Sequence, residues 1–292
     1  MDQTNFSRAD KEIPVADQHN GNNAVDSSTD EKDVQDASRL SAVLIYEVIR
    51  RDGVEELHRP VQSLIYSGLA AGIFISLSVL GEAVFRDQLP DTAWRPLVEN
   101  LGYSFGFLVV ILGRMQLFTE NTITTVLPVI NDFCLRSVGR AAQLWGVVFL
   151  SNMVGAFIAA IFIAHTPTFD ADFLSTVTQL SEHAVGYDPD VLFFKAIPAG
   201  VIVAAIVWML PSGTAANFFV ILTFTWLIAA GDFAHVVAGA VEMAYLVVTG
   251  AMPLYDGFAG FLVPVFAGNV VGGTVVFTLL AWGQVKNEVQ RR

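Results

Sequence analysis

The sequence of 292 residues is poor in charge. Asp, Glu, Lys and Arg make up only 15% of it, whereas soluble globular proteins carry about 25%. Its one cysteine, Cys134, excludes an internal disulfide and a metal cage made of cysteines alone. Because it has no dinucleotide loop, phosphate loop or metalloprotease motif, we expect no enzyme, no metal and no cofactor. The net charge of −12 argues against a nucleic-acid partner.

Apolar residues are abundant, at 53% of the chain, and they gather in long segments. A membrane-spanning helix needs about 20 such residues. Six segments follow Pro60, at 61–85, 97–130, 144–164, 191–210, 218–248 and 258–282. The pattern predicts an all-α polytopic membrane protein whose six transmembrane helices occupy residues 60–285.

The flanking segments have a different composition. Residues 1–40 hold nine acidic and four basic residues without apolar periodicity, which predicts a disordered acidic cytoplasmic tail. Residues 41–59 have apolar residues at helical spacing and end at Pro60, which predicts an amphipathic helix at the membrane surface. Residues 286–292 are expected to form a cytoplasmic C-terminal tail.

The second and fifth segments are too long for one crossing, and polar or flexible residues interrupt each near its middle, at 113–121 and 231–235. The third and sixth segments share an Asn-x-x-Gly pattern, at Asn152 and Asn269. These matches predict an inverted repeat of three plus three helices in which helices 2 and 5 are broken. Broken helices at matching places indicate a translocation site near the midplane.

Polar residues at the breaks are the candidate site. Thr119 follows the first break, and His235, at the second, can exchange a proton near neutral pH. Asp232 could orient the His235 ring or favour its charged form. Asn152 and Asn269 are placed to bond the freed backbone, and Asn269 is a candidate to reach the pore.

Ionisable residues within the spans are expected to face an interior or to pair with one another. Arg114 and Glu120 bracket the first break and are expected to neutralise each other. Lys195 either attracts anions to an outer vestibule or extends to the interface. Glu82 also lies in a span, and Glu242 is a candidate for a subunit contact. Apolar constrictions are predicted from the residues Leu117, Phe118 and Phe233.

Lysine and arginine positions predict the orientation. With both termini cytoplasmic, the inner side carries Arg50, Arg51, Arg59, Arg136, Arg140, Lys286, Arg291 and Arg292. The outer side then carries only Arg86 and Arg95, and the loop at 165–190 has acidic residues but neither Lys nor Arg before 191.

Three motifs resemble the formate/nitrite transporter family. They are the run from Gly106 to Thr119 with its Leu-Phe-Thr, the Phe-Ala-His ending at His235, and the Gly-Asn-Val-Val-Gly-Gly that begins at Gly268. The resemblance covers about residues 41–285 and is strongest to a divergent bacterial branch. The sequence departs from the family pattern at Arg114, Glu120 and Gly239.

The resemblance implies an aquaporin-like homopentamer in the bacterial inner membrane, with one pore per protomer for small monovalent anions such as formate or nitrite. It implies that Thr119 bonds the central His235, that Leu117, Phe118 and Phe233 lie at constrictions, and that Asn269 is a pore residue.

The sequence therefore predicts a channel or transporter for small monovalent anions, with proton coupling through His235 as one mechanism. Two alternatives stay open. One is a pore for neutral solutes in which Arg114 and Glu120 select the solute. The other is a membrane scaffold or sensor that does not transport.

Overall fold

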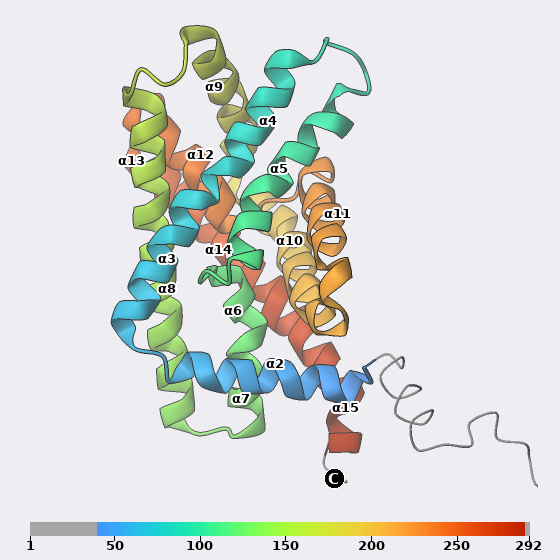
Figure 1. The fold of residues 1–292 in the computed structure, drawn as a ribbon. Helices are drawn as coiled ribbons and strands as arrows, with labels where there is room; N and C mark the ends of the chain where they lie inside the picture. The colour runs from blue at the N-terminus through green and yellow to red at the C-terminus, as the bar shows by residue number, and fades with distance from the viewer. Residues whose placement is uncertain (1–39, 290–292) are drawn as a thin grey trace, which may run out of the picture. The chain divides into compact units, whose positions relative to one another are not determined.

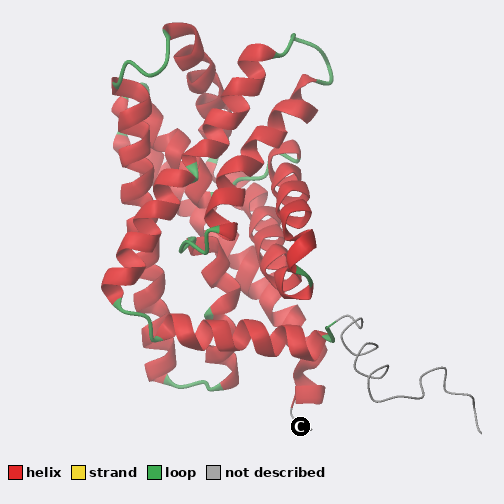
Figure 2. Ribbon diagram, in the orientation of Figure 1, coloured by secondary structure: helices red, strands yellow, loops and turns green. Residues whose placement is uncertain are grey.

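The computed structural model describes residues 40–289, and throughout that range its regular elements are helices, with no strand (Figure 2). The predicted tail is outside this range except for Leu40, as are residues 290–292. The first half contains α2 (Ala42–Leu57), α3 (Val61–Phe74), α4 (Ser76–Gln88), α5 (Arg95–Leu112), α6 (Phe118–Thr124), α7 (Val126–Asn131), α8 (Leu135–His165) and α9 (Ala171–Val185).

The second half contains α10 (Pro189–Met209), the short turns η1 (Leu210–Ser212) and η2 (Thr214–Ala216), α11 (Asn217–Ala230) and α12 (Val236–Val248). It ends with α13 (Leu254–Asp256), η3 (Gly257–Leu262), α14 (Val263–Val270), η4 (Val271–Thr278) and α15 (Leu279–Val289). The last helix extends to Val289, so residues 286–289, predicted as part of a tail, are helical.

Five helices in the described residues are long and apolar enough to cross a membrane: Val61–Gln88, Arg95–Leu112, Leu135–His165, Pro189–Ser212 and Leu254–Val289. The fifth predicted span, 218–248, is instead the two shorter apolar helices α11 and α12, separated by a turn. This is the predicted break. The second predicted span is likewise divided, into α5 on one side and α6 with α7 on the other.

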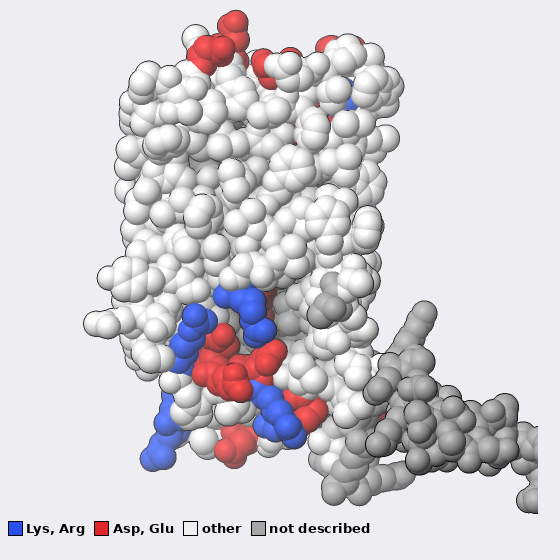
Figure 3. All heavy atoms as spheres, in the orientation of Figure 1, with Lys and Arg blue, Asp and Glu red and all other residues white. Residues whose placement is uncertain are grey.

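The charged residues leave a broad belt of the surface free. On the face shown in Figure 3, Lys, Arg, Asp and Glu lie at the two ends of the bundle, with uncharged residues between them. Large apolar side chains are exposed along α8, among them Leu150, Val154 and Phe162. A belt of this kind fits the hydrocarbon layer of a bilayer, where charge is costly. The chain is a multi-pass membrane protein.

Helix α2 lies across one end of the bundle (Figure 1). It begins at Ser41, whose hydroxyl accepts a hydrogen bond from the Leu44 N–H at 3.4 Å. Val43, Tyr46 and Ile49 are buried, together with Leu127 of α7 and Val285 of α15. At the other end lies α9, which the sequence analysis treated as a loop. The Asp170 carboxylate caps this helix at the Phe173 N–H, 2.9 Å away.

Close helix packing relates the two halves. A Cβ on Gly72 would lie 2.2 Å from the Asn152 carbonyl oxygen, and a Cβ on Gly200 would lie 2.3 Å from that of Asn269. Helix α3 therefore approaches α8 as α10 approaches α14, with glycine allowing the contact in both cases. The two breaks lie beside these helix pairs.

Candidate functional site

The first break is a helix end in which a residue other than glycine adopts a left-handed conformation. Helix α5 ends at Gly113, and Arg114 follows with φ of 51°. The N–H groups of Arg114 and Met115 donate to the carbonyls of Ile111 and Val110, both at 3.0 Å. This pair of bonds is a Schellman motif, which satisfies the last carbonyls of α5 and turns the chain sharply.

The second break repeats this geometry 118 residues later. Helix α11 ends at Gly231, and Asp232 has φ of 53°. The N–H groups of Asp232 and Phe233 donate to the carbonyls of Ala229 and Ile228, both at 2.9 Å. The two breaks are therefore the same structure, as the repeat predicts.

An asparagine holds each half-helix. Asn152 Oδ1 accepts from the Phe118 N–H at 2.9 Å, and Asn152 Nδ2 donates to the carbonyls of Gln116 and Gly68 at 2.9 and 2.8 Å. This amide satisfies backbone groups that the break leaves free, which lipid cannot do. The sequence prediction for Asn152 is thus met in the structure.

Asn269 makes the equivalent bonds in the second half. Its Oδ1 accepts from the Val236 N–H at 2.8 Å, and its Nδ2 donates to the carbonyls of Ala234 and Ala196 at 2.9 and 2.7 Å. The Asn269 side chain is fully buried and lines neither of the two cavities described below. It supports the second break, and the structure does not place it in an open pore.

A hydrogen bond joins the two halves at the centre. Thr119 Oγ1, in the first turn of α6, lies 2.8 Å from His235 Nε2, and both residues are buried. His235 is also the N-cap of α12, where its Nδ1 accepts the Ala238 N–H at 3.2 Å. The ring of Phe107 packs edge-on against the imidazole, with centroids 5.0 Å apart.

These contacts define the tautomer of His235. A ring nitrogen that accepts from a backbone N–H carries no hydrogen, so Nδ1 is unprotonated. The neutral ring then carries its hydrogen on Nε2 and donates it to Thr119 Oγ1. The Thr119 hydroxyl hydrogen has no acceptor among residues 40–289 and is available to another group.

Two cavities lie toward opposite ends of the described chain, and they are named outer and inner after the predicted orientation; His235 lines the first, and Thr119 lines neither. The outer cavity, of about 560 Å³, opens near α9 and is lined by residues that include Tyr103, Lys195, Phe233 and His235. The inner cavity, of about 430 Å³, lies beside α2 and is lined by residues that include Arg114, Leu117 and Glu120. Each break therefore contributes to a different cavity.

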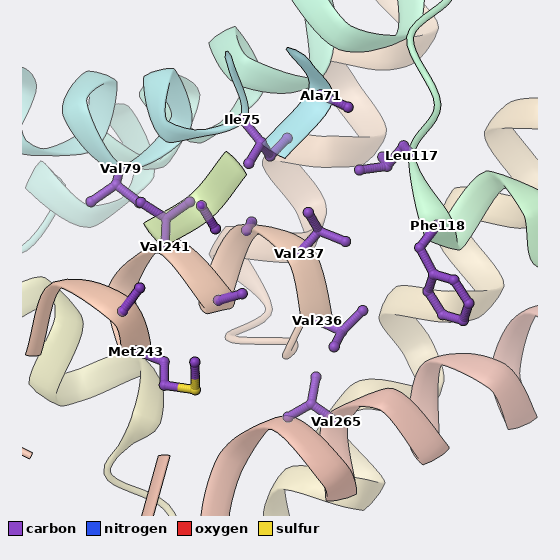
Figure 4. Packing of buried hydrophobic residues seen from close by; sticks show 14 of the residues in the cluster. Ala71, Ile75, Val79, Leu117, Phe118, Val236, Val237, Val241, Met243 and Val265 are labelled. Carbon is purple, nitrogen blue, oxygen red and sulfur yellow. The ribbon is translucent and has the colours of Figure 1, made fainter. Parts of the chain in front are cut away.

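The three predicted constriction residues occupy different places. Leu117 lines the inner cavity and Phe233 the outer one. Phe118 lines neither, because its ring packs among Trp145, Phe149 and Phe266, with centroids 4.8 to 5.5 Å away. Figure 4 shows residues of both breaks, such as Leu117 and Val236, within one cluster of buried side chains.

Two predicted charge pairings differ from the structure. Asp232 does not contact the His235 ring. Its carboxylate instead accepts from Lys195 Nζ at 2.6 Å and from the Tyr187 hydroxyl at 2.5 Å. Because the left-handed turn at Asp232 directs its side chain toward α10, the carboxylate meets Lys195. Lys195 is thus neither a free vestibule cation nor extended to the interface.

Arg114 and Glu120 do not form the expected ion pair. Within residues 40–289, neither side chain takes part in a salt bridge, and one buried carboxylate oxygen of Glu120 has no hydrogen-bond partner. Both residues line the inner cavity, on opposite sides of the turn. Arg114 is exposed and in the left-handed conformation, so its side chain leaves the turn in another direction.

Outside the spans, the bond to Asp232 raises the pKa of Tyr187 to about 12, because the phenol donates to the carboxylate. The Lys195 ammonium also lies 4.2 Å from the centre of the Tyr187 ring. Sequence analysis did not identify Tyr187 as part of the site, and its position between α9 and α10 has no recognisable sequence signal.

Comparison with known proteins assigns the family. The chain is 39% identical to the inner membrane protein YfdC of Escherichia coli (strain K12) over 281 residues, which cover 94% of this chain and 91% of that protein. It is 28% identical to the formate channel FocA of Haemophilus influenzae over 270 residues, covering 81% of this chain and 93% of that protein.

Solved structures have the same fold. An FNT family ion channel superposes with a TM-score of 0.73 at 22% identity, covering 82% of this chain and 98% of that one. A pentameric formate channel with formate bound superposes with a TM-score of 0.66 at 19% identity, covering 77% and 98%. The family model described as formate/nitrite transporter matches residues 43–283. The chain therefore belongs to the formate/nitrite transporter family.

Proposed function

We propose that this protein passes small monovalent anions such as formate or nitrite across the bacterial inner membrane. The observation that carries the proposal is the Thr119–His235 pair: His235 lines the outer cavity, and no residue in 40–289 accepts the threonine hydroxyl hydrogen. An anion at this point gains a hydrogen-bond donor where the surrounding side chains are apolar. Donors aimed into a site of low dielectric stabilise negative charge far more than they do in water.

We assign a shared role to the two side chains. The imidazole holds the Thr119 oxygen as an acceptor, and this directs the hydroxyl hydrogen away from the ring and toward the path. Leu117 and Phe233, one on each side, exclude the hydration shell of larger ions. The path then favours a small ion that can shed its water, or the neutral acid formed from it.

The names of similar proteins support two further proposals, on the membrane location and the oligomeric state. One solved relative is a pentameric formate channel, and YfdC is an inner membrane protein. We infer the same location and a homopentamer for this chain, with both termini cytoplasmic as the lysine and arginine positions predict. The exposed apolar residues of α8 would then face lipid or a neighbouring protomer. Native mass spectrometry in detergent measures the oligomer number directly.

Flux into proteoliposomes tests the proposal. Purified protein is expected to transport formate and nitrite above the rate of protein-free liposomes. Thr119→Val removes the hydroxyl and keeps the shape, so we expect flux to fall at least about tenfold, whereas Thr119→Ser keeps the hydroxyl and most of the flux. If the valine and serine variants transport equally, the hydroxyl has no part in anion passage.

Osmotic swelling with small uncharged solutes distinguishes the proposed anion channel from the main alternative, a pore for neutral solutes. A neutral-solute pore would admit these solutes and would show no loss with Thr119→Val. Among the described residues, Arg114 and Glu120 form no ion pair with each other, which gives no support to their role as a selectivity pair.

A further inference from the structure

The outer cavity carries more acidic than basic side chains. Its lining includes four carboxylates, at Glu82, Glu99, Asp232 and Glu242, and two permanent cations, at Arg86 and Lys195. Such an excess is unexpected beside a path for anions, because unneutralised carboxylates repel them.

Two of the four carboxylates are neutralised by cations. Glu99 binds Arg86 at 2.5 Å and lies 3.5 Å from Arg95. Asp232 binds Lys195 at 2.6 Å. These two pairs use both cations of the cavity lining.

Glu82 and Glu242 have no such partner. They are only 7% and 6% exposed, and neither makes a hydrogen bond or ion pair with any residue in 40–289. Both line the outer cavity, Glu82 from α4 and Glu242 from α12, and these helices pack against each other. Tyr103, a buried residue of α5, lines the same cavity, and its hydroxyl makes no hydrogen bond within the described chain.

The surroundings of these two carboxyl groups are otherwise accounted for. The other titratable or charged groups that face the cavity come from α4, α5, α9, α10 and the α11–α12 turn: Arg86, Glu99, Tyr103, His183, Tyr187, Lys195, Asp232 and His235. Of these, Arg86, Glu99, Lys195 and Asp232 are paired as described, Tyr187 donates to Asp232, and His183 Nε2 lies 3.4 Å from the Asp232 carboxylate. Within residues 40–289, no Lys or Arg of the cavity lining is left to pair with Glu82 or Glu242.

An unpaired carboxylate in such a place is unstable. Removing a charge from water is costly in free energy when no partner compensates it. The group avoids this by binding a proton or a cation from the cavity. A protonated carboxyl group is neutral, donates a hydrogen bond and no longer repels an anion.

His235 is poorly placed to be the proton donor itself. Its Nδ1 accepts the Ala238 N–H, and in the neutral ring the only hydrogen is shared with Thr119. An imidazolium would carry a second hydrogen on Nδ1 and would lose the cap of α12. The proton for a weak acid therefore has a better source in the outer cavity, which His235 also lines.

We propose that Glu82 and Glu242 form a proton-donating carboxyl pair that neutralises a weak-acid anion in the outer cavity before it reaches Thr119 and His235. The O–H bond of one glutamic acid breaks as an O–H bond forms on the anion, leaving the neutral acid and an unpaired carboxylate, which is short-lived because its burial is costly. Water at the mouth of the cavity then returns a proton to the carboxylate. This inference rests on the proposed function and names the group that couples protons to it.

The test measures protons and anion together. Proteoliposomes that contain a trapped pH-sensitive dye take up radiolabelled formate under an inward proton gradient. The wild type is expected to take up one proton with each formate and to run faster as the outer pH falls. Glu82→Gln and Glu242→Gln each keep the side-chain shape and remove the proton donor.

We expect the Glu82→Gln/Glu242→Gln double variant to lose on the order of a hundredfold in proton-coupled uptake and to lose its pH dependence, in line with general-acid catalysis. Glu242→Asp, which keeps a carboxyl group, should restore part of both. Glu182→Gln, on the exposed side of α9, is the matched control and should behave as the wild type. Gel filtration of each variant checks assembly.

Two outcomes overturn the inference in distinguishable ways. If the double variant assembles and keeps the wild-type proton-to-formate ratio and pH profile, the carboxyl pair is not the donor, and the proposed function stands. If the wild type takes up neither formate nor nitrite above protein-free liposomes, the proposed function fails and the inference fails with it.

Discussion

Leu117 and His235 occupy the same position in the two halves of the molecule. Each is the extended residue that precedes a half-helix, with φ and ψ of −96° and 126° for Leu117 and −112° and 125° for His235. The backbone is repeated, but the side chains are not: leucine lines the inner cavity and imidazole lines the outer one. The two breaks are therefore built alike, and they differ in the side chain that each presents to its cavity.

The two asparagines should contribute equally to stability. Asn152→Ala and Asn269→Ala each leave a buried N–H and carbonyls of a break without a partner. We expect each to lower the free energy of unfolding by about 3 kcal/mol, since an unsatisfied buried group costs about 1–3 kcal/mol. Thermal unfolding in detergent measures this. Asn131→Ala, at an exposed helix end, is the control and should change it little; equal effects at all three positions would contradict the assignment.

Adding a methyl group at either of the two close helix contacts should destabilise the protein to a similar extent. Gly72→Ala and Gly200→Ala place a Cβ against a backbone carbonyl in the opposite helix. We expect each to cost about 1–3 kcal/mol through overpacking. Gly283→Ala, where nothing lies within 4 Å, should be neutral or slightly stabilising. The same unfolding measurement applies, and a neutral result for Gly72→Ala or Gly200→Ala would show that α3 and α10 can move apart freely.

Substitution by glycine should change the unfolding free energy differently at the two left-handed residues, Arg114 and Asp232. Arg114→Gly removes the strain of φ 51° without loss of an ion pair, so we expect a gain of up to about 1 kcal/mol in unfolding free energy. Asp232→Gly relieves similar strain but removes the contacts to Lys195 and Tyr187, so we expect no gain. Chemical denaturation of both variants is the measurement. A destabilised Arg114→Gly would mean that the side chain has a role at the inner cavity.

The single cysteine reports the orientation of the chain. Cys134 is exposed in the loop between α7 and α8, which the proposed orientation places in the cytoplasm. A membrane-impermeant maleimide should therefore label inside-out vesicles and spare right-side-out ones. Labelling of right-side-out vesicles alone would reverse the assigned orientation.

The same reaction has an expected pH dependence. The Ser137 hydroxyl bonds the Cys134 sulfur and lowers the pKa of the thiol. The thiolate is the reactive form and is present above that pKa. The labelling rate should thus begin to rise at a lower pH than it does for an ordinary cysteine. Ser137→Ala should move the profile to higher pH; an unmoved profile would show that Ser137 does not act on the thiol.

Much of the architecture follows from local patterns in the sequence. The apolar segments were long enough to identify spans, and the two segments that were too long located both breaks. The paired Asn-x-x-Gly motifs located the residues that support the breaks. The helix at 171–185 was not predicted, although it has a capping aspartate and apolar residues at helical spacing, because a segment between two spans is usually a loop.

The pairing of charges could not be predicted in the same way. Sequence proximity suggested that Asp232 acts on His235 and that Arg114 neutralises Glu120. A left-handed turn directs Asp232 to Lys195, which is 37 residues earlier in the chain. Glu82 and Glu242 come from different halves of the sequence, and only the packing of α4 against α12 places them in one cavity.

The sequence alone determined that this chain is a membrane protein built from two similar halves with matching breaks, because hydrophobic length and repeated motifs are local properties. Only the tertiary structure decided which side chains meet: Thr119 meets His235, Lys195 meets Asp232, and Glu82 and Glu242 meet no partner within residues 40–289. Those contacts depend on how helices far apart in the chain pack, and side-chain direction at a turn depends on a backbone angle that spacing does not reveal.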